Sequence, residues 1–174
     1  MVFSFDAVGL IDMQEKHKQS LLRENPASSK KELETILENQ KEPLYYCAIY
    51  KKPVAILTYE SRGDILQKLK EPINNLPIRA HIEKKMLRKN APLNRKWEEE
   101  LTTFYQTHQA TRILLAGMFL ESCVYDAANH LTITGHKIFL AENLVDNPHQ
   151  FPKSTKPSFY DIKTTYIRDF RELL

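Results

Sequence analysis

The chain has 174 residues, and its 25 lysines and arginines nearly balance its 22 aspartates and glutamates, which leaves a formal net charge of +3 at pH 7. A chain of this length buries about 70% of its unfolded surface, so we expect a single domain over 1–174. The small positive excess is not clustered, which argues against nucleic acid or a membrane surface as a partner.

The cysteine content is typical of a protein of a reducing compartment, and the apolar runs are too short for a membrane span. Two cysteines, Cys47 and Cys123, do not make a disulfide framework. No stretch approaches the roughly 20 apolar residues of a membrane span. The first residues also lack the charged region and the cleavage site of a signal peptide. We therefore expect a cytoplasmic protein, with Cys47 in its core.

The first half of the chain alternates between predicted strands and helices. The apolar run Ala7–Ile11 predicts a strand, and Asp12 follows it directly. Ser29 and Glu32 have the spacing of a capping box, which predicts the start of a helix that we expect Pro43 to interrupt. The next expected elements are a strand at Pro53–Tyr59, a short helix at Ile65–Leu69, a strand at Ile78–Lys84 that ends in lysines, and a helix at Asn94–His108.

The stretch from Arg112 to Gly135 carries most of the functional signal. Arg112–Ala116 is an unbroken apolar run, which is typical of a central parallel strand covered on both faces, and Gly117 ends it. Apolar residues at helical spacing then predict a helix that begins around Cys123 and stops at Gly135. A thiol in the first turn of a helix has a lowered pKa, because the helix dipole favours an anion there.

Three chemically distinct groups thus follow predicted strands: the acid Asp12, a run of lysines after residue 83, and the thiol of Cys123. In open α/β sheets, ligands bind outside the carboxyl ends of the strands, where the strand order reverses. Such a sheet brings these side chains together although they lie far apart in the sequence.

In these motifs the chain resembles the isochorismatase-like cysteine hydrolases, a family that includes nicotinamidases and N-carbamoyl amidohydrolases. In the family a strand ends in Asp-x-Gln, as in IDMQ at 11–14, and a Gly stands six residues before the nucleophilic Cys, as in LLAGMFLESCV at 114–124. The helix then leads to a Gly, a strand and an acid, similar to Gly135, Lys137–Ala141 and Asp146. The resemblance implies a three-layer α/β/α sandwich with a mostly parallel, Rossmann-like sheet of five or six strands.

The resemblance also implies roles for individual residues. Asp12 matches the acid that takes the thiol proton, and Cys123 matches the nucleophile. For the lysine of the triad, one branch of the family has a basic residue, four residues and then Asn-Ala, which selects Lys85 before Asn90-Ala91. Counting back from the Gly favours Lys89 instead, and Lys84 is also near. We choose Lys85 as the third member of the triad.

The family further has a cis peptide bond, which would join Met118 and Phe119 here, and it would aim the backbone N–H groups of Phe119 and Cys123 into an oxyanion hole. The implied substrate is a small amide, carbamoyl or related molecule, and the implied assembly is a homo-oligomer. Many nicotinamidases carry a metal-binding Asp-x-His-x-x-His motif after the second strand, where this chain reads ESRGDILQKL. The six histidines show no metal-ligand spacing, so we expect neither a metal nor another cofactor.

Beyond Asp146 the chain departs from the family. After a segment with three prolines, Phe159–Leu174 is expected to form one terminal helix, and the sixth strand of relatives to be short or absent. Two alternatives to amide hydrolysis stay open: a catalytically silent binding protein that keeps the fold, and a vinyl-ether hydrolase of the isochorismate type. The presence of Cys123 favours the amide reaction, because some isochorismatases act by acid chemistry without a cysteine.

Overall fold

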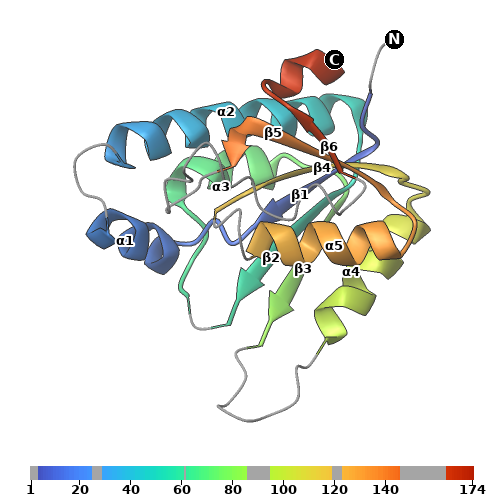
Figure 1. The fold of residues 1–174 in the computed structure, drawn as a ribbon, viewed down its shortest axis with the longest axis horizontal. Coiled ribbons are helices and arrows are strands. Elements are labelled where there is room, and N and C mark those ends of the chain that lie inside the picture. Colours follow the sequence, from blue (N-terminus) through green and yellow to red (C-terminus); the bar gives the residue numbers. More distant parts are fainter. Residues whose placement is uncertain (1–3, 25–28, 61, 86–94, 119–122, 146–163) are drawn as a thin grey trace.

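The computed structural model describes residues 4–24, 29–60, 62–85, 95–118, 123–145 and 164–174 of the chain. In these ranges a six-stranded parallel sheet has the strand order β3-β2-β1-β4-β5-β6 (Figure 1). The strands are β1 (Ala7–Ile11), β2 (Val54–Tyr59), β3 (Arg79–Lys84), β4 (Arg112–Gly117), β5 (Lys137–Val145) and β6 (Thr164–Ile167). The order reverses between β1 and β4, as in doubly wound folds.

Helices cover both faces of this sheet. They are α1 (Glu15–Glu24), α2 (Ser29–Tyr50), α3 (Gln67–Asn74), α4 (Lys96–Thr107), α5 (Tyr125–Ile133) and the 3₁₀ turn η3 (Phe170–Leu173). One apolar cluster joins α2, α3 and η3 to one face, and a second cluster joins α4 and α5 to the other (Figure 1). The predicted three-layer α/β/α architecture is therefore confirmed.

The strands alternate between these two clusters residue by residue. Val54 and Ile56 of β2 lie in the first cluster, whereas Ala55 and Leu57 lie in the second. The alternation follows from the period of two residues in a strand, and burial on both faces explains the unbroken apolar runs. The five strands expected up to residue 141 are confirmed, with small differences at their ends.

Helix α2 differs from the prediction at Pro43, which lies inside one continuous helix and does not interrupt it. A proline inside a helix costs about 3 kcal/mol, because it removes a backbone hydrogen bond. Burial of the same helix face on both sides of Pro43, at Leu37 and at Leu44 and Cys47, offsets this cost. The expectation that Cys47 belongs to the core is confirmed.

The prediction of one terminal helix at Phe159–Leu174 is wrong in its described part. Residues 164–167 form β6, which pairs with the free side of β5 and satisfies its backbone groups there. Within the described residues 164–174, helical structure is limited to Phe170–Leu173, which begins with a capping box between Asp169 and Glu172. β-branched residues in TTYI favour the strand.

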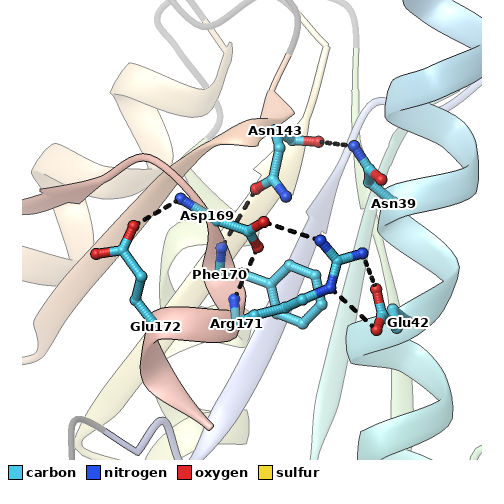
Figure 2. A network of polar contacts seen from close by, with 7 residues as sticks. All are labelled: Asn39, Glu42, Asn143, Asp169, Phe170, Arg171 and Glu172. Carbon is cyan, nitrogen blue, oxygen red and sulfur yellow. Dashed lines mark hydrogen bonds and ion pairs between the residues drawn. The ribbon is translucent and has the colours of Figure 1, made fainter.

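The end of the chain is fixed to α2 by polar contacts (Figure 2). The Arg171 guanidinium pairs with the carboxylates of Glu42 and Asp169. Asn143 of β5 accepts hydrogen bonds from the Asn39 side chain and from the Phe170 backbone N–H. These contacts hold Phe170 and Leu173, both buried, against the first cluster.

Among the described residues, no helix has the length and apolar character needed to cross a membrane.

Candidate active site

The sequence-predicted acid and thiol lie where the strand order reverses. Asp12 follows β1 directly, and Cys123 lies between β4 and α5. β1 and β4 are neighbours in the sheet, with Ile11 paired to Gly117 at their carboxyl ends. This is the position at which α/β folds of this type bind their ligands.

Gly117 allows these two strands to approach closely. A Cβ atom at this position would lie 2.6 Å from the backbone oxygen of Ile11 and 2.7 Å from the Ile11 Cβ atom. It would also lie 3.1 Å from a methyl group of Val124, the residue after Cys123. A side chain at position 117 would therefore push apart the strand that carries Asp12 and the turn that carries Cys123.

Asp12 is fully buried and has a left-handed backbone, with φ of 55°. Aspartate is among the few residues that tolerate this conformation. The carboxylate Oδ2 atom accepts a hydrogen bond from the Nζ atom of Lys84 at 2.7 Å. Among the described residues, the Oδ1 atom has no hydrogen-bond partner. Asp12 thus has one oxygen bound to a cation and a second oxygen available as a proton acceptor.

The structure brings Lys84 to Asp12, and not Lys85, which was our choice from the sequence. Lys84 is 5% exposed, whereas Lys85 is exposed just beyond the end of β3. The difference follows from strand alternation, because Lys84 lies on the same face as buried Ile82 and Lys85 is one residue further along. The third alternative, Lys89, lies outside the described residues.

Two aromatic rings surround the ammonium group of Lys84. Its Nζ atom lies 4.4 Å from the ring centre of Tyr59 and 5.7 Å from that of Trp97. Tyr59 and Lys84 are paired in register on β2 and β3, and Trp97 comes from the first turn of α4. Both contacts are of the cation–π type, in which the face of an aromatic ring attracts a cation. Trp97 is partly buried and packs against the second cluster, and it also borders Lys84.

Cys123 is half-buried in a wide turn that leads directly into α5. It packs against the second cluster, and its side chain is hydrogen-bonded to Tyr59. Burial, then the charges of Cys123 and Asp12, raise the pKa of Tyr59. Tyr59 is therefore close to both the thiol and the acid, and its hydroxyl stays protonated near neutral pH.

Gln14, the last residue of the Asp-x-Gln motif, holds the end of β2 in place. Its side-chain oxygen accepts from the Tyr59 backbone N–H at 2.7 Å, and its Nε2 atom donates to the backbone oxygens of Tyr59 and Gly63 at 3.0 and 2.6 Å. The motif thus supplies an acid from its first residue and positions Tyr59 with its last.

Three residues that lie near the site were not predicted from the sequence to be part of it: Tyr59, His17 and Asp126. His17 of α1 is buried, and its ring centre lies 5.8 Å from that of Tyr59. Burial lowers the pKa of His17, against the opposing charge of Asp12. Burial also raises the pKa of Asp126, in the first turn of α5, against the opposing charge of Lys84.

Several predictions fall on residues that are not described. The cis peptide bond between Met118 and Phe119, the Phe119 part of the oxyanion hole, and Asp146 all lie outside the described residues in whole or in part. Within the described ranges, no group of three or more His, Cys, Asp or Glu side chains is arranged to hold a metal ion. The expectation of no metal stays a prediction.

Comparisons of sequence and of structure give different results. No model of a known protein family matches the chain, and no curated protein matches it. Solved structures do match. The YcaC gene product of Escherichia coli, an octameric hydrolase of unknown specificity, has a TM-score of 0.70 at 16% identity over 97% of this chain and 77% of its own.

Two other matches have different activities in their names. The nicotinamidase SaPncA of Staphylococcus aureus has a TM-score of 0.67 at 13% identity, over 95% of this chain and all of its own. The MAR1 ribonuclease of Caenorhabditis elegans has a TM-score of 0.66 at 14% identity, over 99% of this chain and 80% of its own. The matches also include an isochorismatase family protein. The chain therefore has the isochorismatase-like fold.

Proposed function

We propose that this chain, which has the isochorismatase-like fold, is a cysteine hydrolase of small amide, carbamoyl or related substrates. Asp12 serves as the base, Cys123 as the nucleophile and Lys84, in place of Lys85, as the cation of the triad. The observation that carries the proposal is the buried ion pair between Lys84 and Asp12, at the same edge of the sheet as Cys123. Buried charge pairs cost desolvation energy and are frequent at functional sites.

In the first half of the reaction, the free Oδ1 atom of Asp12 takes the proton of the Cys123 thiol. The sulfur then attacks the carbonyl carbon of the substrate, and the carbonyl oxygen becomes an oxyanion. Lys84 keeps a positive charge beside Asp12 and limits the cost of moving charge in a buried site. We assign the oxyanion to backbone N–H groups, Cys123 among them.

In the second half, the oxyanion collapses and the C–N bond breaks. The leaving amine or ammonia takes the proton that Asp12 received, which leaves a thioester on Cys123 and an ionised Asp12. Asp12 then accepts a proton from a water molecule, the resulting hydroxide attacks the thioester, and the sulfur leaves. The thiolate regains the proton from Asp12, and the acid product departs. The enzyme is then back in its starting state.

The structural neighbours support a hydrolase but do not select its substrate. Their names include a nicotinamidase, a hydrolase of unknown specificity and a ribonuclease, so one fold carries several reactions. We favour the amide reaction because it needs a nucleophile and a base, and a cysteine and a lysine-paired aspartate can supply them. A vinyl-ether hydrolase has no need of Cys123, and a silent binding protein has no need of the buried ion pair.

The octameric neighbour also supports the family-based expectation that copies of this chain assemble. We propose a homo-oligomer, which light scattering of the purified protein tests directly. A monomer at micromolar concentration would contradict this part of the proposal.

The function is tested with a panel of small primary amides and carbamoyl compounds, with release of ammonia as the measurement. We expect the wild-type protein to release ammonia from at least one compound, and Cys123→Ala to release none above the uncatalysed rate. The Cys47→Ala variant is the matched control, because it removes the other thiol, and its activity should persist. Hydrolysis that survives in Cys123→Ala would contradict the proposal.

A further inference from the structure

Tyr59 is held in place more firmly than a surface residue at the end of a strand would be. It is the last residue of β2, and both its backbone N–H and its backbone oxygen are bound by the Gln14 side chain. Its ring is close to two other groups of the site, with the Lys84 Nζ atom 4.4 Å from the ring centre and the centre of the His17 ring 5.8 Å away. The backbone and the ring of Tyr59 are thus both held by neighbouring side chains.

The direction of the side chain follows from the strand. Tyr59 is two residues after Leu57, which packs in the second cluster with α4 and α5. Cys123 packs against that same cluster. The hydroxyl of Tyr59 therefore points to the layer of the fold in which the thiol lies, and it is hydrogen-bonded to Cys123.

The hydrogen bond has a defined direction when Cys123 is ionised. A thiolate has no proton to donate, and a protonated tyrosine hydroxyl has one, so the hydroxyl donates to the sulfur. The neighbouring negative charges favour the protonated tyrosine, and burial does the same. A hydrogen bond to the charged form of a group lowers the pKa of that group.

We propose that Tyr59 is a positioning residue that donates a hydrogen bond to the Sγ atom of Cys123, stabilises the thiolate and orients it for attack. This inference rests on the proposed function, because it assumes that the Cys123 thiolate is the nucleophile. It adds a fourth side chain to the triad of Asp12, Lys84 and Cys123. The same tyrosine also contacts the lysine of that triad, so it joins the thiol to the ion pair.

The test compares Tyr59→Phe with the wild-type protein, since phenylalanine keeps the ring and its contact with Lys84 but removes the hydroxyl. The measurement is the rate of alkylation of Cys123 by iodoacetamide between pH 5 and pH 10, followed by peptide mass mapping. We expect the midpoint of the rate profile to move upward by about one pH unit, which is about a tenfold loss of rate below the midpoint. With a substrate in hand, kcat should fall more than KM changes.

Tyr45→Phe is the matched control. It removes a hydroxyl that binds Glu71 on the surface between α2 and α3, away from the carboxyl ends of β1 and β4. Its alkylation profile should coincide with that of the wild type. A Tyr59→Phe profile that also coincides, with Cys123 still reactive, would overturn the inference and leave the proposed function standing. A wild-type Cys123 no more reactive than Cys47 would overturn both.

Discussion

The Nζ atom of Lys84 lies 2.7 Å from the Oδ2 atom of Asp12, although these residues belong to β3 and to the end of β1, with β2 between them. The long lysine side chain spans the intervening strand and passes the ring of Tyr59. Both charged side chains are buried. A buried charge that loses its partner is strongly destabilising, so each residue of this pair depends on the other.

The lysine of the triad is identified by substitution with methionine, which keeps the length of the side chain. We expect Lys84→Met to abolish turnover and Lys85→Met to retain most of it, because Lys84 contacts Asp12 and Lys85 is exposed beyond the end of β3. Steady-state kinetics on a substrate from the amide panel provide the measurement. An inactive Lys85→Met or Lys89→Met beside an active Lys84→Met would contradict the assignment.

The coupling of the buried pair is measured by a double-mutant cycle. Lys84→Met leaves the Asp12 carboxylate without its cation and should cost about 3–5 kcal/mol of unfolding free energy. Asp12→Asn is the suitable partner variant, because asparagine also tolerates the left-handed backbone at this position. The double variant should be more stable than the sum of the two single effects predicts. Additive losses in urea unfolding would show that the pair is not coupled.

Asp12→Asn also tests the role of the base. The amide cannot accept the thiol proton, so kcat should fall on the order of 10²–10⁴-fold. The control is Asp64→Asn, which replaces an exposed acid paired with Lys70 at the surface. Full activity in Asp12→Asn would remove this residue from the mechanism.

The two cysteines should differ sharply in reactivity. Burial raises the pKa of Cys47 to about 12, so its thiol is protonated at neutral pH and shielded from reagents. Cys123 is half-buried, precedes a helix and lies beside Tyr59. Brief treatment with iodoacetamide at pH 7 should label Cys123 much faster than Cys47. Equal labelling, or preferential labelling of Cys47, would argue against the assigned nucleophile.

A separate prediction concerns stability in acid. Asp6 is partly buried, which alone would raise its pKa, but hydrogen bonds from Arg112 and Thr111 outweigh this and lower the pKa to about 2. A lowered folded-state pKa contributes stability above the unfolded value near 4, and that contribution is lost as the pH falls toward 2. Asp6→Asn should therefore lower the unfolding free energy by about 1 kcal/mol at pH 7, a value reduced by the exposure of Arg112.

Urea unfolding of the wild type and of Asp6→Asn at pH 7 and at pH 2 checks this prediction. The difference between the two proteins should shrink at the lower pH. A difference that stays constant would show that the Asp6 charge does not contribute.

The strands, and the candidate site residues that follow them, could be predicted because the signals for buried strands are local in the sequence. Apolar runs such as Ala7–Ile11 and Arg112–Ala116 indicate buried parallel strands without any knowledge of their partners. The position of Asp12 and of Cys123 after such strands then follows. The alternation in β3 also held the information on the lysine, because Ile82 marks the buried face and Lys84 lies two residues further on. The match to Asn90-Ala91 was a weaker guide than this parity.

The remaining differences depend on contacts between distant segments. The helix across Pro43 persists because its buried face packs on the sheet, and β6 forms because β5 offers a free edge. Tyr59 was missed since the apolar residues Val54–Leu57 at the start of β2 do not show which face of the strand lies toward Cys123. The paired register of β2 and β3, which the sequence does not reveal, places Tyr59 beside Lys84.

The central claim is that Cys123 forms a thioester with the acyl part of the substrate. The most direct measurement is acid quenching of the wild-type protein during turnover of a substrate from the amide panel, followed by peptide mass mapping. We expect the acyl mass on the peptide that contains Cys123, and none on the peptide that contains Cys47. Turnover without an adduct on Cys123, together with unchanged hydrolysis by Cys123→Ala, would contradict the account.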